Sequence, residues 1–154
     1  MKVLTEQNKM LISKKIEIDM GHRVPNHKSK CRNIHGHRYT IEVGVEDRVI
    51  TTKGDSSEGM VIDFGILKEI MMLEIDAVYD HSFTISDKDD LVDKFREIRD
   101  TMDMKINVVS FIPTAENLAE YWYYILEKEL VENKIKIKYV KVWETPTSTA
   151  TYEE

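Results

Sequence analysis

Three histidines form the clearest chemical pattern in the sequence. His35 and His37 are two residues apart, and on a β-strand such residues project to the same side with backbones about 7 Å apart. His22 ends an earlier alternating segment on its apolar parity, so an antiparallel hairpin would bring the three imidazoles together. Three neutral imidazoles with an open fourth position are typical of catalytic zinc sites. We therefore predict a metal site here, with His27 solvated in the intervening loop.

The alternative is that each histidine is an ordinary core or surface residue. Four of the five histidines lie between positions 22 and 37, and three of them share one predicted strand face. This concentration on one face favours metal binding over the ordinary interpretation.

Acid–base side chains occur in two further places. Cys31 lies between the two predicted strands among basic residues, and that surrounding, with a nearby cation, favours the thiolate. A thiolate there can act as general base, nucleophile or fourth metal ligand, whereas an inert loop cysteine is the alternative. Asp80 and His81 follow the first predicted helix, where the carboxylate can raise the basicity of the ring. Taken alone, this dipeptide is not specific.

Other polar residues point to a hydrogen-bonding, anionic ligand. Glu144 shares the parity of Val140 and Val142, so it can face a pocket and accept paired N–H donors from a pterin or guanine ring. A simple surface glutamate is the competing interpretation. Glu116, in the first turn of a predicted helix, can be only a favourable charge at the helix dipole. Residues 23–38 hold five basic residues and no acidic one, which indicates either an anionic ligand or a solvated basic loop.

Alternation of apolar and polar residues predicts the strands. Residues 11–22 and 35–45 each alternate with period two, as half-buried strands do. Residues 106–111 predict a brief strand, and residues 134–144 predict a last one. The apolar phase of that last strand changes near Val140, which a bulge or a two-sided strand would explain.

Two long helices are predicted between the strands. Asp63 is a good N-cap for a helix that runs to Val78, and Thr114 is a good N-cap for a second one. The charged segment 86–104 predicts a short exposed helix and a loop. This order of elements predicts an α+β fold in which an antiparallel four-stranded sheet is covered on one face by the two long helices.

Length, charge and cysteine content restrict the class of protein. The 154 residues, 42% of them hydrophobic, predict a single domain over residues 1–154. The net charge of -6 argues against nucleic acid or an anionic membrane as partner, and no apolar run approaches the span of about 18 residues that a bilayer requires. One cysteine cannot form an internal disulfide, and the first ten residues lack the apolar core of a signal peptide, so we expect a soluble, cytoplasmic protein.

Over nearly its whole length the sequence resembles the family of 6-pyruvoyltetrahydropterin and 6-carboxytetrahydropterin synthases. The blocks that carry the resemblance stand in family order: MGHRVPNHKSKCRNIHGHRY at 20–39, GMVIDFGILK at 59–68, DHSF at 80–83, PTAENLA at 113–119 and VWETP at 142–146. The resemblance implies that His22, His35 and His37 bind zinc and that Cys31 abstracts a proton. It further implies that Asp80 and His81 form a proton relay. Glu144 would anchor the pterin and assist proton transfer, and Thr114 and Glu116 would help to hold the pterin ring.

The spacing around Cys31 favours one branch of the family. Three residues separate it from the HGH motif, as in the 6-carboxytetrahydropterin branch, whereas the animal pyruvoyl enzymes have a longer spacing. Membership of that branch implies a carbon–carbon lyase that converts 7,8-dihydroneopterin triphosphate to 6-carboxy-5,6,7,8-tetrahydropterin, with release of acetaldehyde and triphosphate, in queuosine biosynthesis. The resemblance also implies the tunnelling fold, in which subunits join their sheets into a trimeric barrel that often doubles to a hexamer, with active sites between subunits.

Parts of the sequence are also compatible with three other functions: a related synthase, a binding module and a cupin-type metal enzyme. A 6-pyruvoyltetrahydropterin synthase would eliminate triphosphate from the same substrate. A pterin- or deazaguanine-binding module would keep the metal without turnover, although the presence of Cys31, Asp80 and His81 argues against it. HGHRYTIE at 35–42 also fits a cupin pattern, but a cupin needs a further histidine on a later strand, and two long helices fit a β-barrel poorly.

Overall fold

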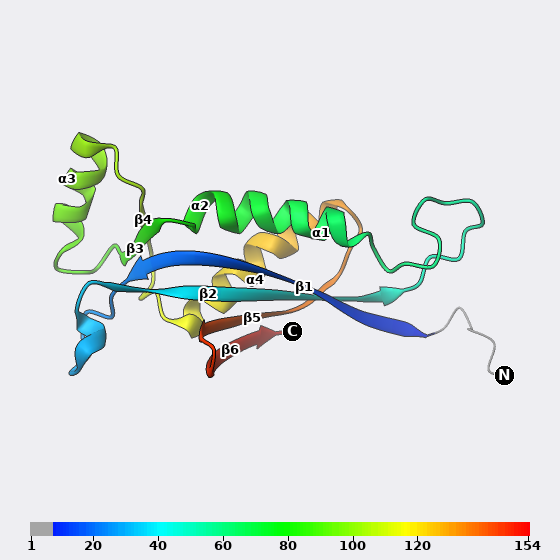
Figure 1. Cartoon of the computed structure of the whole chain (residues 1–154), viewed down its shortest axis with the longest axis horizontal. Helices are drawn as coiled ribbons and strands as arrows, with labels where there is room; N and C mark the ends of the chain where they lie inside the picture. Colours follow the sequence, from blue (N-terminus) through cyan, green and yellow to red (C-terminus); the bar gives the residue numbers. More distant parts are fainter. Residues whose placement is uncertain (1–7) are drawn as a thin grey trace.

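Two long antiparallel strands form the centre of the molecule. The computed structural model describes residues 8–154, in which β1 (Lys9–His22) pairs with β2 (His35–Arg48) along its whole length, from Lys9 opposite Arg48 to His22 opposite His35. This is the hairpin that the two alternating segments predict. Figure 1 shows both strands running along most of the length of the molecule. The segment used to argue against a signal peptide includes residues 1–7, which lie outside the described part of the chain.

The sheet is mixed and has six strands, so the prediction of a plain four-stranded antiparallel sheet was wrong. Its order is β4-β3-β1-β2-β5-β6, with β3 parallel to β1 and to β4 and the other pairs antiparallel. The remaining strands are β3 (Ser82–Ser86), β4 (Ile106–Val109), β5 (Ile137–Thr145) and β6 (Ser148–Glu153). The predicted strands at 106–111 and 134–144 correspond to β4 and β5.

The two strands that sequence patterns missed lack apolar alternation. In β3 the buried residues include Ser82, Thr84 and Ser86, which are polar and so give no hydrophobic signal. In β6 every residue is exposed or only partly buried, because this strand lies at the edge of the sheet. Neither strand could be distinguished from a loop by its sequence pattern.

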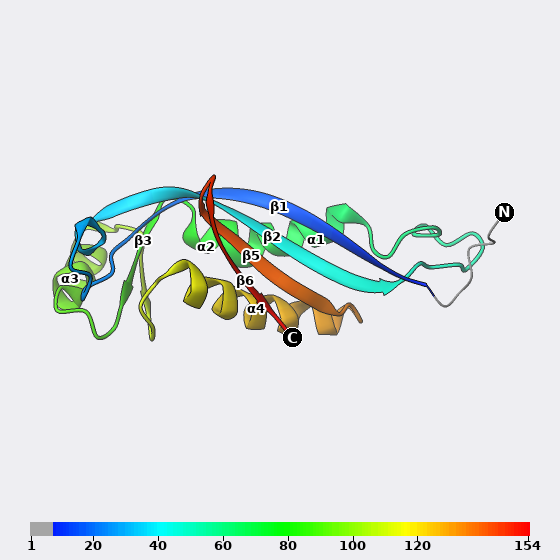
Figure 2. The same ribbon diagram turned by 90° about the horizontal axis from the view of Figure 1, so that it is seen from below.

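The helices lie against one face of the sheet. One continuous helical rod comprises α1 (Phe64–Met71), the π-helical turn η2 (Met72–Asp76) and α2 (Ala77–Tyr79), and the other long helix is α4 (Ala115–Glu132). Both predicted N-caps are present, since Asp63 Oδ1 accepts from the Gly65 N–H at 2.7 Å and Thr114 Oγ1 from the Asn117 N–H at 3.3 Å. Figure 2 shows α4 beneath the curved sheet, and the rod packs against β1.

Two shorter helices lie near the end of the sheet where the histidines are. The 3-10 turn η1 (Lys30–Arg32) lies in the loop between β1 and β2, and α3 (Val92–Met102) follows β3. Figure 1 places α3 beside β3 and β4 at the far end of the molecule. The predicted short helix within residues 86–104 is therefore present, between two strands. No helix within residues 8–154 is long and apolar enough to cross a membrane.

The core lies between the sheet and the two long helices. Ile41 and Val140 from the strands pack with Leu67 of α1 and Trp122 of α4, and all four are fully buried. In the β2–β5 pairing Gly44 stands opposite Tyr139 and Val45 opposite Ile137, which leaves Lys138 as an extra residue. Of the two explanations for the change of phase, the bulge is the one present. Beyond the bulge, Val140, Val142 and Glu144 share the face of the sheet that carries His22 and His37.

Candidate metal centre

The hairpin brings His22, His35 and His37 together at one end of the sheet. One ring nitrogen from each lies within 4.8 Å of the other two, and the ring centroids are 4.6 Å apart for His22 and His35, 5.1 Å for His22 and His37 and 5.0 Å for His35 and His37. Direct pairing of His22 with His35 across the two strands produces this arrangement. Among the described residues this is the group of side chains that could hold a metal ion.

Backbone carbonyls select which nitrogen of two rings is free. His22 Nδ1 lies 2.7 Å from the Pro113 carbonyl oxygen, and His35 Nδ1 lies 2.8 Å from that of Asn33. A carbonyl only accepts, so each Nδ1 carries the proton and Nε2 has its lone pair available. This is the arrangement that orients metal-bound histidines and fixes their tautomer.

The state of the ring nitrogens fits a metal ion. Nε2 of His22 and Nε2 of His37 are buried and have no hydrogen-bond partner in the described structure, although a buried polar atom normally has one. Burial lowers the pKa of His22 below its ordinary value, and it lowers that of His37 against the opposing effect of Glu144. Both rings are therefore held neutral near pH 7, which is the form that binds a metal.

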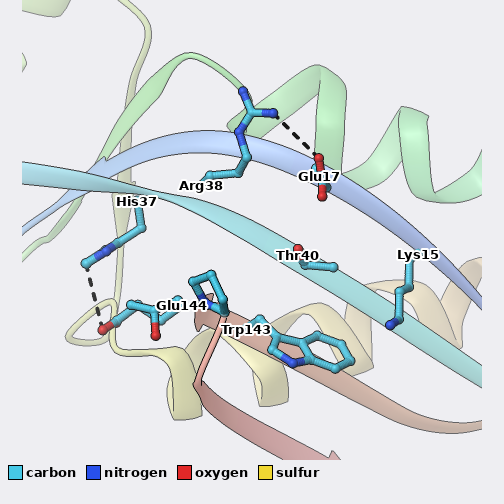
Figure 3. A pocket seen from close by; sticks show the side chains of 9 residues that line it. Lys15, Glu17, His37, Arg38, Thr40, Trp143 and Glu144 are labelled. Atoms are coloured by element: carbon cyan, nitrogen blue, oxygen red, sulfur yellow. Dashed lines mark ion pairs between the residues drawn. The ribbon is translucent and has the colours of Figure 1, made fainter.

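Glu144 faces the same group of histidines. Its carboxylate oxygens lie 3.8 Å from His37 Nε2 and 4.0 Å from His22 Nε2, and the side chain is about one-quarter exposed, at 28%. Glu144 and His37 also line a cleft of about 530 Å³ that continues over Arg38, Trp143 and Lys15. Figure 3 shows the carboxylate and the imidazole pointing toward each other at the end of β5, while Arg38 projects from the opposite side of β2.

Cys31 lies in the loop beside the histidines but outside their group. It belongs to η1 and is partly buried, and its carbonyl oxygen accepts from the Val24 N–H at 2.9 Å. That bond holds the cysteine turn against the residues that directly follow His22. The thiol is not among the ligand atoms that lie within 4.8 Å of one another.

Asp80 and His81 contact each other, as predicted, but they do not contact His22, His35 or His37. His81 Nδ1 is 2.6 Å from Asp80 Oδ2, and Asp80 Oδ1 accepts from the Asp19 N–H at 2.8 Å. The side chain of His81 is 77% exposed and its φ of 56° is left-handed. The His81 N–H also donates to the Asp19 carbonyl oxygen at 2.7 Å, so the pair is held against the backbone of β1 three residues before His22. Within residues 8–154 no hydrogen bond or ion pair joins it to the three histidines.

The remaining predicted residues are Thr114, Glu116 and the basic residues of segment 23–38. The Thr114 side chain caps α4, and Glu116 is exposed in the first turn of that helix. Two members of the basic segment are committed to carboxylates, since Arg23 pairs with Asp89 and Arg38 pairs with Asp19. Lys28, Lys30 and Arg32 remain exposed. Among the described residues, three exposed cations of the basic segment therefore lie outside these two ion pairs.

A comparison with protein families decides the affiliation of the chain. The model described as "6-pyruvoyl tetrahydropterin synthase" matches residues 11–154. The chain belongs to the 6-pyruvoyl tetrahydropterin synthase family. The match includes all three histidines, Cys31 and Glu144.

Curated relatives come from the carboxy branch of this family. The chain is 33% identical over 135 residues to the 6-carboxy-5,6,7,8-tetrahydropterin synthase of Rickettsia bellii, with 87% of this chain and 93% of that protein covered. It is 32% identical over 143 residues to the enzyme of that name from Haemophilus influenzae, with 93% and 98% covered. It is 34% identical over 163 aligned positions to that of Aquifex aeolicus, with 93% and 97% covered.

Solved structures share the fold, among them a 6-pyruvoyl tetrahydropterin synthase. An uncharacterized protein from Wolinella succinogenes superposes with a TM-score of 0.79 at 26% identity, over 96% of this chain and 99% of that one. The 6-pyruvoyl tetrahydropterin synthase of Caenorhabditis elegans superposes with a TM-score of 0.68 at 25% identity, over 97% and 99%. The tunnelling-fold architecture predicted from the family resemblance is thus present, with the six-stranded sheet as its form in this chain.

Three residues around the three histidines were not predicted from the sequence as part of the site. Pro113 and Asn33 act through their carbonyl oxygens, which no side-chain pattern reveals. The hydroxyl of the buried Tyr39 lies 3.3 Å from His22 Nδ1. Tyr39 shares the strand parity of the two HGH histidines, so its parity was a signal that could have identified it.

Proposed function

We propose that this protein is a 6-carboxy-5,6,7,8-tetrahydropterin synthase. It would convert 7,8-dihydroneopterin triphosphate and water to 6-carboxy-5,6,7,8-tetrahydropterin, acetaldehyde and triphosphate, in the biosynthesis of queuosine and other 7-deazaguanines. The observation that carries the proposal is the group of three histidines beside Glu144, in a chain about one-third identical to relatives with that name. The spacing of three residues between Cys31 and His35 supports the same branch.

The metal in this proposal is zinc, held by Nε2 of His22, His35 and His37. Three imidazoles and an open position suit zinc, and the carbonyls of Pro113 and Asn33 orient two of the rings. When bound, zinc supplies Lewis-acid stabilisation of the negative charge that develops on oxygen atoms of the substrate side chain. The neutral state of His22 and His37 leaves the ligand positions free of competing protons near pH 7.

Glu144 and Cys31 act on the substrate in this proposal. The carboxylate of Glu144 accepts paired N–H donors of the pterin and assists proton transfer, because it borders both the cleft and the histidines. Cys31 lies in the loop whose two ends are His22 and His35, and as a thiolate it would remove a proton from carbon. Proton removal and return at the side chain of the substrate permit a retro-aldol type of carbon–carbon cleavage.

A neighbouring subunit completes the site in this proposal. Asp80 and His81 contact each other and the backbone of Asp19, and within residues 8–154 no hydrogen bond or ion pair joins them to the histidines of their own chain. We therefore infer that their proton relay serves the site of another subunit in a trimer or hexamer. Thr114 and Glu116, near the start of α4, would help to hold the pterin ring. We further propose that residues 1–154 form one domain and that the enzyme works in the cytoplasm, where a lone cysteine stays reduced.

Product analysis tests the proposed reaction. The purified protein is incubated with zinc and 7,8-dihydroneopterin triphosphate, and the products are identified by mass spectrometry. We expect acetaldehyde and a carboxypterin. Formation of a pyruvoylpterin would instead establish the pyruvoyl reaction, and stoichiometric binding of a pterin without turnover would establish a binding module.

Two variants separate the roles of metal ligand and acid–base group. Cys31→Ala should retain one zinc per chain and lose turnover, whereas His35→Ala should lose both. His27→Ala is the matched control, because His27 is an exposed loop histidine whose Nδ1 accepts from the Ser29 N–H at 3.0 Å. Normal turnover by Cys31→Ala would contradict the role assigned to the thiolate.

A further inference from the structure

A buried ion pair lies directly behind the metal centre. Arg23 Nη1 is 3.0 Å from Asp89 Oδ1, and the two side chains are only 8% and 0% exposed. We propose that this pair is a positioning device that ties the segment 87–104 to the metal-binding end of β1 and holds His22 in place. The proposal rests on the metal-dependent function proposed above.

Asp89 joins three parts of the chain through its carboxylate and its backbone N–H. Besides Arg23, it accepts from the Leu91 N–H at 2.9 Å, just before α3 begins. The Asp89 N–H donates in turn to the Ser86 carbonyl at 3.1 Å, at the end of β3. One residue thus fixes the turn between β3 and α3, and its side chain connects that turn to Arg23, the residue after β1.

These contacts close a ring of interactions around His22. His22 is the last residue of β1 and lies beside Thr84 of β3 in a parallel ladder. Two residues beyond Thr84 the chain reaches Ser86, then the Asp89 turn, and from there the ion pair returns to Arg23, the residue after His22. The backbone of His22 is therefore held from β2, from β3 and through its neighbour Arg23.

Stability alone does not account for the pair. Desolvation of two charges offsets most of their attraction, and replacement of such pairs by apolar residues is often neutral or stabilising. Arg23 Nε and Asp89 Oδ2 are also buried without a hydrogen-bond partner in the described structure. Such a pair adds little to the free energy of unfolding. It does fix the position of Arg23 relative to Asp89, because a hydrogen bond is directional and apolar contacts are not.

The segment that carries Asp89 is itself anchored. The rings of Phe83 in β3 and Phe95 in α3 stack with centroids 4.5 Å apart at an interplanar angle of 5°. The segment then returns through β4, which pairs with β3 from Phe83 opposite Ile106 to Ser86 opposite Val109. Residues 87–104, called the extension below, are therefore fixed to β3, and Asp89 in this segment holds Arg23 in place.

Zinc affinity tests the proposal. Competition with a chromogenic chelator should show that Arg23→Met binds zinc about 10–100-fold more weakly than wild type, as for other losses of support behind metal ligands. Arg96→Met is the matched control, since Arg96 makes an exposed ion pair with Asp93 on the same extension, and its affinity should be unchanged. Arg23→Lys, which keeps the charge opposite Asp89, should recover most of the affinity. Unchanged affinity in a folded Arg23→Met variant would overturn the inference.

A double variant distinguishes positioning from a merely structural role. The double variant Arg23→Met/Asp89→Leu removes both charges, so its melting temperature should return toward that of the wild type. Its zinc affinity should stay as low as that of Arg23→Met. The visible spectrum of the double variant with cobalt(II) bound should also differ from that of the wild type. Recovery of affinity together with stability would overturn the positioning role. If Arg23→Met fails to fold, this double variant and Arg23→Lys carry the test. Wild-type protein that binds no zinc would instead refute the proposed function, so the two failures are distinguishable.

Discussion

Gly36 separates the two histidines of the HGH motif, and its substitution tests how closely the hairpin sets the metal geometry. Gly36 lies directly opposite Gly21 in the β1–β2 ladder. A Cβ at position 36 would lie 2.9 Å from the Met20 carbonyl oxygen and 3.3 Å from the Gly21 Cα. Carbon–oxygen contacts between strands normally measure about 3.3–3.6 Å, so Gly36→Ala must move one backbone away from the other by roughly 0.4–0.7 Å.

That displacement separates His35 and His37 from His22, because His22 is on the other strand. Metal–ligand distances tolerate only about 0.2 Å of change, so we expect a loss of zinc affinity of about 10–100-fold, similar to the loss of a supporting contact. Overpacking costs about 1–3 kcal/mol, and the reduced freedom of the unfolded chain returns about 0.4–1 kcal/mol. A net loss of roughly 1–2 kcal/mol corresponds to a melting temperature lower by about 2–8 °C for a chain of this size.

The assay combines chelator competition with thermal unfolding of the metal-free protein. Gly65→Ala is the control, because a Cβ at Gly65 would approach only the flexible side chain of Asp63, at 3.1 Å. It should leave zinc affinity unchanged. Gly36→Ala with wild-type affinity and wild-type melting temperature would refute the reasoning that close backbone approach at this point sets the separation of the ligands.

Three further outcomes are expected. Free zinc at one hundred times its Kd should stabilise the protein by about 2.7 kcal/mol and raise its melting temperature by about 5–11 °C, with no such shift in His35→Ala. Tyr39→Phe should keep most of the zinc affinity, since His22 Nδ1 is already bonded to the Pro113 carbonyl at 2.7 Å; a loss as large as that of His35→Ala would contradict this. The Asp19 N–H, and after it His81 and Lys105, holds the pKa of Asp80 below its ordinary value, so stability from this group is present above about pH 3.8 and is lost as the pH falls through the lower native pKa. Asp80→Asn should therefore flatten the acid limb of the stability curve measured by denaturant unfolding, and an unchanged limb would show that these contacts do not act through ionisation.

Strand parity explains how far sequence could predict the site. The period-two pattern placed His22, His35 and His37 on one face, and also Glu144 once the bulge at Lys138 was allowed for. These residues belong to long, half-buried strands in which the apolar pattern fixes the register. The two N-caps at Asp63 and Thr114 were equally visible, because capping depends on local residue types.

The remaining features depend on contacts between distant segments. Arg23 belongs to a run of basic residues in the sequence, but its partner Asp89 is 66 residues away, and no local pattern predicts that pairing. Asp80 and His81 are adjacent in sequence and in contact, yet their distance from the histidines depends on where β3 joins the sheet. Because β3 buries polar side chains, its place beside β1 was hidden from hydrophobic patterning.

The bulge at Lys138 bears on how the chain tolerates changes of length. Because Lys138 is the unpaired extra residue, loss of its single codon would leave a regular strand with Ile137, Val140 and Glu144 on their present face. Loss of a codon between the bulge and Glu144 would instead exchange the faces of the residues on one side of the deletion. Where the residues after the deletion shift, Thr145 would take the place of Glu144, and the carboxylate would face away from the histidines. The bulge can thus absorb a one-residue deletion during evolution without changing the face of Glu144, whereas a one-residue deletion three to five positions further along β5 would change it.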